Sequence, residues 1–139
     1  MPGEGGGVLA TTGLLGLEPG DWIRRILAEA VVGGLPVSTH SNVYETGRLV
    51  NSGAGLFFGF SVYNSNADPQ FIQLFDLTAA PASGSVPEAV FTAAGTSHLA
   101  VSYIFPGRYF RTGIWIGNSS TGPTYTAGGA DCFYDCQYA

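Results

Sequence analysis

Residues 57 to 63 read Phe57-Phe58-Gly59-Phe60-Ser61-Val62-Tyr63. A short run of aromatic and β-branched residues such as this predicts a β-strand. Because successive side chains of a strand point to opposite faces, we expect one face to carry Phe58, Phe60 and Val62. The other face then carries Phe57, Gly59, Ser61 and Tyr63. A strand with so apolar a face is typical of a sheet that packs over a hydrophobic core.

Similar runs recur along the chain, and clusters of Gly, Pro, Asn and Ser separate them. We expect further strands near residues 43–50, 70–77, 86–92, 99–103, 110–116 and 131–138. Short strands between turn residues are typical of antiparallel sandwiches and barrels. The sequence therefore predicts an all-β fold, an antiparallel β-sandwich of the jelly-roll kind with about seven or eight strands.

The predicted strand at 110–116 carries two side chains of particular interest. In the strand at 110–116, Arg111 and Trp115 lie on the face opposite Ile114 and Ile116. Trp115 is either a core or subunit-interface residue, or an exposed ring that stacks on a sugar. The two-residue repeat puts Arg111 on the same face of the strand as this ring.

Cys132 and Cys136 are the only cysteines of the chain. In a regular strand they point the same way about 13 Å apart, at roughly 3.3 Å per residue. That separation is too large for a disulfide bond. We therefore expect two buried free thiols, which fits synthesis in a reducing cytoplasm.

Residues 1–36 differ in character from the rest. Residues 1–20 form a Gly-rich arm, and a short helix is predicted to begin at Asp21 and to end at Gly33-Gly34. The arm holds leucines but too many glycines to fold alone. We therefore predict that residues 1–36 anchor the protein to a partner and that residues 37–139 form the β-sandwich domain.

The composition indicates which kinds of partner the protein binds. Hydrophobic residues make up 45% of the chain and charged residues 11%, with a net charge of −5 and no lysine. The charged share is less than half of the quarter or so that is usual in soluble domains. We expect a homo-oligomer, with a trimer favoured. The acidic balance argues against a nucleic-acid partner, and no apolar run is long enough to span a membrane.

No catalytic or metal-binding motif is present. His40 and His98 are the only histidines, and neither has a partner at metal-ligand spacing. We predict that the protein is not an enzyme and needs no cofactor. Calcium ligands and Asx turns remain alternatives for the loop that contains Asn64, Asn66 and Asp68.

Three stretches resemble small structural proteins of tailed bacteriophages and prophages. They are Tyr63-Asn64-Ser65-Asn66-Ala67-Asp68-Pro69-Gln70-Phe71-Ile72-Gln73-Leu74-Phe75-Asp76, Gly113-Ile114-Trp115-Ile116-Gly117-Asn118-Ser119-Ser120-Thr121 and Ala130-Asp131-Cys132-Phe133-Tyr134-Asp135-Cys136-Gln137-Tyr138. The resemblance covers roughly residues 43–138 and consists of strand and turn residues. It implies a β-sandwich virion protein, closest in role to capsid decoration proteins, also called cement proteins.

Such a protein forms a trimeric knob on the outer capsid surface and bridges neighbouring major capsid subunits, which the resemblance implies as partners of this chain. The alternative is a carbohydrate-binding or receptor-binding module of a tail fibre or baseplate, favoured by the sandwich, by Trp115 and by the loop 64–68. We expect partner contacts at a set of apolar and cationic residues: Leu14, Leu15, Leu17, Trp22, Arg25, Ile26, Arg111 and Trp115.

Overall fold

The computed structural model describes Asp21 and residues 35–139. The chain divides into two compact units, Met1–Leu35 and Pro36–Ala139, and the second of them forms the β-sandwich. The predicted arm and all but one residue of the predicted helix lie outside the described residues. So do six of the predicted contact residues, namely Leu14, Leu15, Leu17, Trp22, Arg25 and Ile26.

Nine β-strands lie in the described part of the chain. They are β2 (Val37–His40), β3 (Gly47–Asn51), β4 (Gly55–Asn64), β5 (Gln70–Phe75), β6 (Ala89–Ala93), β7 (Ser97–Ser102), β8 (Arg108–Phe110), β9 (Ile114–Ser119) and β10 (Cys132–Tyr138). The count exceeds the prediction for two reasons. The short strand β2 was not predicted, and the predicted strand 110–116 is divided between β8 and β9.

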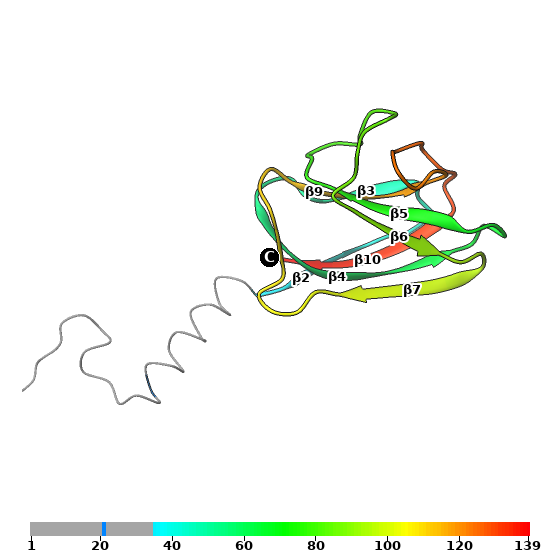
Figure 1. Cartoon of the computed structure of the whole chain (residues 1–139). Coiled ribbons are helices and arrows are strands. Elements are labelled where there is room, and N and C mark those ends of the chain that lie inside the picture. The colour runs from blue at the N-terminus through cyan, green and yellow to red at the C-terminus, as the bar shows by residue number, and fades with distance from the viewer. Residues whose placement is uncertain (1–20, 22–34) are drawn as a thin grey trace, which may run out of the picture. The chain divides into compact units, whose positions relative to one another are not determined.

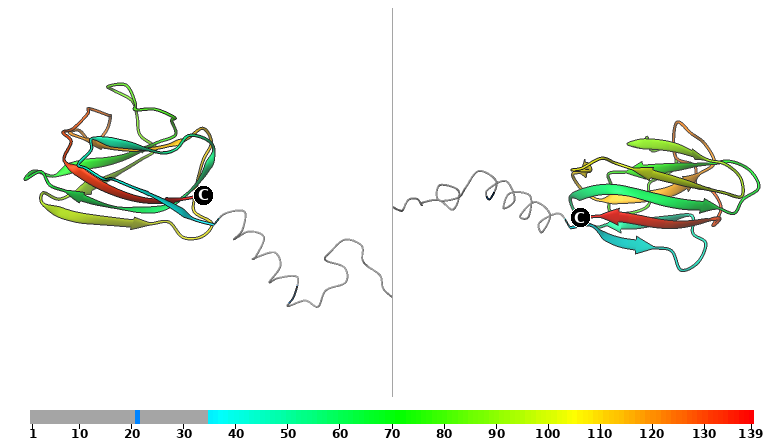
Figure 2. Two further views of the ribbon diagram at one scale, coloured as in Figure 1. Left: turned by 180° about the vertical axis from the view of Figure 1, so that it is seen from behind. Right: turned by 90° about the horizontal axis from the view of Figure 1, so that it is seen from below.

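The strands form two antiparallel sheets that pack face to face as two layers (Figures 1 and 2). One sheet has the order β2-β10-β4-β7, with β8 beside β4, and the other has the order β3-β9-β5-β6. The pairing is nested along the chain, because β2 pairs with β10, β3 with β9, β4 with β7 and β5 with β6. Nested pairing over two sheets is the jelly-roll arrangement. The predicted jelly-roll-like β-sandwich is therefore confirmed.

The hydrophobic core fills the space between the two inner faces. It is built from alternate residues of the central strands, among them Phe57, Phe60, Val62, Ile72, Leu74, Ile114, Ile116, Cys132, Tyr134 and Cys136. Both cysteines are free and buried, as predicted. Burial raises the pKa of the Cys132 thiol to about 11 and that of the Cys136 thiol to about 12. Both sulfurs therefore stay protonated at neutral pH and behave as small apolar core groups.

The prediction for the faces of residues 57–63 was wrong at two positions, Phe57 and Phe58. Phe57 lies in the core with Phe60 and Val62, whereas Phe58 lies on the opposite face. A β-bulge causes the change, because Gln137 pairs with Gly59 while the next residue, Tyr138, pairs with Phe57. The extra residue shifts the alternation by one.

Glycine is required at this bulge. Gly59 has a φ of +147°, a conformation that residues with a side chain rarely adopt. A Cβ atom at this position would lie 2.3 Å from the carbonyl oxygen of Val101 on β7. The glycine thus lets β4 carry a bulge while it stays paired on both sides.

We predict that Gly59→Ala lowers the free energy of unfolding by at least about 2 kcal/mol, because it combines backbone strain with a clash against a paired strand. Chemical denaturation measures this change. Gly53→Ala is the matched control, since no atom lies within 4 Å of a Cβ at Gly53. It should change stability by no more than about 0.5 kcal/mol. Equal effects of the two substitutions would contradict a structural requirement for glycine at the bulge.

Candidate functional site

The predicted contact residue Trp115 is buried within its own chain. Its ring lies on the outer face of the β3-β9-β5-β6 sheet and is 6% exposed. Phe75 and Tyr125 complete the cluster, with ring centroids 6.0 Å and 5.7 Å from that of Trp115 in edge-to-face geometry. The position opposite Ile114 and Ile116 is confirmed. Stacking of a sugar on Trp115 would require Tyr125 to move away.

Two glycines make room for this ring. Gly47 of β3 and Gly117 of β9 are paired in register, and the indole lies against both. A Cβ atom would lie 2.2 Å from the ring at Gly47 and 2.0 Å from it at Gly117. Glycine at these two positions therefore reflects the packing of a second, small core formed by Phe75, Trp115 and Tyr125.

Arg111, the other described contact residue, does not share a strand with Trp115. Residues 111–113 cross from one sheet to the other between β8 and β9, and Arg111 is exposed there. The carboxylate of Asp76 fastens this crossing. It accepts hydrogen bonds from the backbone N–H groups of Arg111 (3.2 Å), Thr112 (2.7 Å) and Gly113 (3.1 Å).

These contacts also set the protonation of Asp76. Desolvation on its own would raise the pKa of this carboxyl. The three backbone hydrogen bonds and the nearby Arg111 guanidinium outweigh desolvation and hold the pKa below its usual value of 3.8. The charged form of Asp76 is therefore the one that the crossing needs.

The loop after β4 uses its polar oxygens internally. Asn64 Oδ1 accepts from the Asn66 N–H at 3.0 Å, and Asn66 Oδ1 accepts from the Asp68 N–H at 2.8 Å. These are Asx turns, one of the two predicted alternatives. The Asn64 amide also donates to the carbonyl oxygens of Asp68, Ala93 and Ala94. The side-chain oxygens of Asn64 and Asn66 thus stabilise the loop itself.

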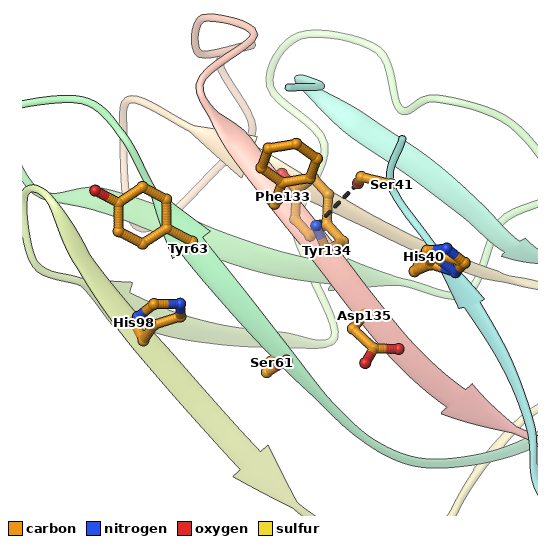
Figure 3. Close-up of a pocket in the computed structure, with 8 residues that line it drawn as sticks. All are labelled: His40, Ser41, Ser61, Tyr63, His98, Phe133, Tyr134 and Asp135. Carbon is orange, nitrogen blue, oxygen red and sulfur yellow. Dashed lines mark hydrogen bonds between the residues drawn. The ribbon is translucent and has the colours of Figure 1, made fainter. Parts of the chain in front are cut away.

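A different set of side chains meets on the outer face of the other sheet (Figure 3). It lines an open groove of about 260 Å³, made by His40, Ser41, Ser61, Tyr63, His98, Phe133, Tyr134 and Asp135. We call it the outer-face groove. Strand register forms it in two rows, with Phe133, Tyr63 and His98 paired across β10, β4 and β7 in the first. In the second row Asp135 lies between His40 of β2 and Ser61 of β4.

The outer-face groove combines aromatic rings with polar groups. The rings of Tyr63 and His98 are in contact, with centroids 4.8 Å apart. At the other side, Tyr44 contacts Phe133 at 4.5 Å. Asp135 is exposed and accepts a hydrogen bond from Gln137. The groove therefore offers apolar surface, a carboxylate, hydroxyls and imidazole nitrogens within one shallow area.

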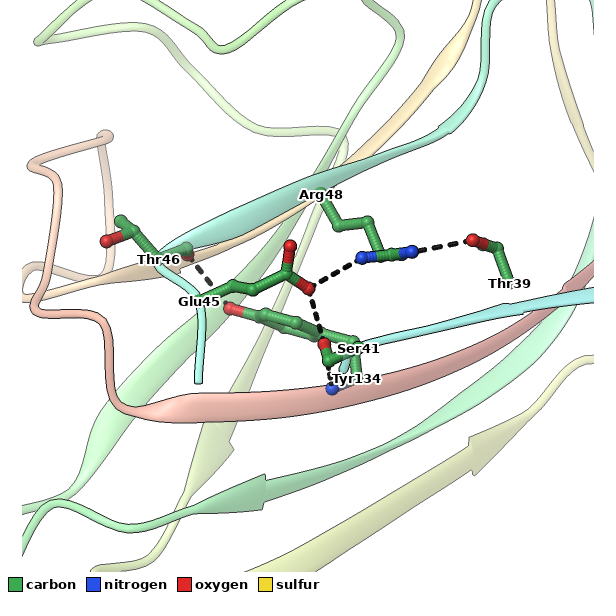
Figure 4. A network of polar contacts seen from close by, with 6 residues as sticks. All are labelled: Thr39, Ser41, Glu45, Thr46, Arg48 and Tyr134. Atoms are coloured by element: carbon green, nitrogen blue, oxygen red, sulfur yellow. Dashed lines mark hydrogen bonds and ion pairs between the residues drawn. The ribbon is translucent and has the colours of Figure 1, made fainter. Parts of the chain in front are cut away.

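A polar network supports the edge of this groove (Figure 4). The Ser41 hydroxyl donates to Glu45 and accepts from the backbone N–H of Tyr134. Arg48 of β3 donates to Glu45 at 2.7 Å and to Thr39 of β2 at 3.0 Å. Since β2 and β3 belong to different sheets, the network joins the two layers at one edge.

Sequence reasoning missed the histidines of this groove. His98 lies near the start of β7, and pairing with β4 brings it beside Tyr63. His40 lies in β2, the strand that was not predicted. In β10, Phe133 and Asp135 lie on the face away from the cysteines, as the two-residue repeat of a strand requires. Alternation within one strand does not show which strands pair with it, so the groove could not be predicted.

A second exposed surface comprises the turn between β7 and β8 and one side chain of β8. Ile104, Phe105 and Tyr109 are 89%, 65% and 63% exposed. We call these three residues the apolar tip. The turn is closed by a hydrogen bond of 2.7 Å from the Gly107 N–H to the Ile104 carbonyl. Gly107 also packs on the Phe58 ring, where a Cβ would lie at 3.3 Å. The tip is therefore supported from below by the sheet.

No protein-family model, curated protein or solved structure matches this chain. Within the described residues, no three His, Cys, Asp or Glu side chains gather in a way that could hold a metal ion. The same part of the chain contains no helix long and apolar enough to cross a membrane.

We predict that Asp76→Ala destabilises the protein by about 1 kcal/mol at pH 7, because three backbone donors lose a charged acceptor that is partly screened by solvent. A lowered native pKa means that this stabilisation is complete above the unfolded-state pKa of 3.8 and is lost as the pH falls through the native value. The difference between wild type and variant should therefore shrink below about pH 4.

Denaturant unfolding at several pH values measures this difference. Asp68→Ala is the control, because the Asp68 side chain accepts no hydrogen bond from the described residues. A stability difference for Asp76→Ala that stays constant from pH 7 to the acid limit would count against the capping role.

Proposed function

We propose that this chain is a structural protein of a tailed bacteriophage virion. Within that class we propose a capsid decoration protein, which binds the outer shell and stabilises contacts between major capsid subunits. The apolar tip is the observation that carries this proposal. Its three large apolar side chains are 63% to 89% exposed, two of them on the turn between β7 and β8 and the third, Tyr109, on β8. Exposed apolar groups held in this way are typical of protein-binding surfaces.

The location of the tip suits attachment at one end of the sandwich. Tyr109 pairs with Leu56, and the backbone of Leu56 is hydrogen-bonded to that of Ala139. The chain enters the sandwich at the same end, since Val37, the first residue of β2, pairs with Tyr138. Figure 1 shows the C-terminus and the loop after β7 at this end. A partner bound at this end would contact the tip and the edge of the sheet where β2 begins.

The stretches that resemble phage structural proteins supply the central strands of both sheets. Residues 63–76 include the end of β4 and all of β5, residues 113–121 contain β9, and residues 130–138 contain β10. In the fold β4 pairs with β10 and β5 pairs with β9. The resemblance therefore concerns the central paired strands of the sandwich. Jelly rolls occur in viral capsid and lectin domains, which supports the proposal by analogy of architecture.

Binding to capsid shells tests the proposal. Shells assembled from the major capsid protein of the same genome are sedimented with this chain, and the bound amount is measured. We expect saturable binding, and we expect the double variant Ile104→Ser/Phe105→Ser to bind at least about tenfold more weakly, because interface anchors cost about 2 kcal/mol or more.

Val86→Ser is the matched control, because Val86 is 74% exposed but lies in the loop between β5 and β6. It should bind like wild type. Deletion of residues 1–34 should leave the β-domain folded and abolish attachment, if those residues are the anchor. Absence of binding by the intact chain would refute the decoration role, and full binding by the tip variant would refute the role of the tip.

We further propose a homotrimer in solution. The low charged fraction of 11% and the exposed apolar side chains favour a protein that buries surface against copies of itself. Light scattering on the full chain at micromolar concentration measures the mass. A trimer mass is the expected result, and a monomer under these conditions would rule the proposal out.

A further inference from the structure

We propose that the outer-face groove binds a saccharide ring. The inference does not depend on the capsid role, because the groove and the apolar tip lie at opposite ends of β4. Tyr63 of the groove is near the end of that strand, and Leu56, which pairs with Tyr109 of the tip, is near its start. One site can therefore be occupied while the other is bound.

The first argument is the contrast between the two outer faces of the sandwich. On the β3-β9-β5-β6 sheet, Tyr125 covers the outward ring of Trp115, and all six residues of β9 are buried. On the other sheet, the outward residues His40, His98 and Asp135 are exposed. The exposed outward side chains of the first sheet, such as Leu49 and Val90, lie on its edge strands β3 and β6, whereas Asp135 lies on the central strand β10 of the second sheet.

The size of the groove limits what can occupy it. Its volume of about 260 Å³ lies just below the range of roughly 300 to 1,000 Å³ that holds drug-sized ligands. It is also open rather than enclosed, and it follows the surface of the sheet (Figure 3). A single ring that lies on the sheet suits this shape.

Aromatic side chains provide the surface on which such a ring can lie. Tyr63 and Phe133 are half-buried neighbours in register on β4 and β10. The rings of His98 and Tyr44 contact them from either side, which restricts their rotation. A sugar ring has an apolar C–H face, and tyrosine offers an apolar body with a polar tip. Stacking against Tyr63 would bury the apolar faces of both.

Polar groups beside these rings suit hydroxyls. Asp135 accepts hydrogen bonds through its carboxylate, and the Ser61 hydroxyl both donates and accepts. The side chains of Ser61, His40 and His98 make no hydrogen bond with other described residues. Since sugar hydroxyls donate and accept, they can use all of these groups. A lysine or arginine ligand only donates, and an anion would be repelled by Asp135.

Saturation-transfer NMR on the full chain tests the inference. The probes are glucose, galactose, mannose, rhamnose and N-acetylglucosamine, each at millimolar concentration, followed by titration of any sugar that binds. The groove variants are Asp135→Asn, which removes the charge from an exposed side chain, and Tyr63→Thr, which removes the ring but keeps a residue that favours strands. Tyr109→Thr is the matched control on the same sheet.

We expect at least one sugar to receive saturation, and each groove variant to weaken its binding by about tenfold or more. Asp135→Asn removes a charged hydrogen-bond acceptor, and Tyr63→Thr removes the ring on which the sugar stacks. Tyr109→Thr should bind like wild type. Thermal unfolding checks that each variant is folded. If Tyr63→Thr does not fold, the binding of Asp135→Asn alone tests the inference. The inference is overturned if none of the five sugars binds, if Asp135→Asn binds like wild type, or if Tyr109→Thr weakens binding equally.

Discussion

Strand β10 lies between β2 and β4 and is hydrogen-bonded to both. Its alternate residues serve two surfaces at once. Cys132, Tyr134 and Cys136 fill the core, while Phe133 and Asp135 face the groove. The Tyr134 hydroxyl also donates to the Thr46 carbonyl at 2.9 Å, just before β3 of the other sheet. Core, groove and the junction between the layers therefore all depend on the placement of this one strand.

The sequence was sufficient for features that depend on local alternation. Residues 131–138 alternate strictly, so the buried cysteines and the outward Asp135 followed from period two alone. The jelly-roll class followed from short strands between turn residues. The faces of residues 57–63 could not be predicted from the run alone, because the bulge arises from the register between β4 and β10. Nothing in the run itself distinguishes a bulge glycine from an ordinary one.

The same limit applies to the candidate site. Trp115 attracted attention as a tryptophan opposite a core face, but its cover comes from Phe75 and Tyr125, which belong to other segments. The continuous strand 110–116 was wrong because Asp76, far away in the chain, caps a crossing at 111–113. The groove joins His40, Asp135 and Ser61 from three strands. Only the register between strands distant in sequence could reveal it.

Nested pairing also has a consequence for how the molecule is made. Val37 pairs with Tyr138, about a hundred residues later in the chain. The ribosome must synthesise β10 before the β2-β10-β4 sheet can form. Until then, the edges of β2 and β4 that pair with β10 remain unpaired. Contacts of such large sequence separation put the domain among slow folders, because loop-closure entropy is lost before the pairing compensates for it. During synthesis, the hairpin of β5 and β6, whose strands follow each other directly, is able to form well before this sheet.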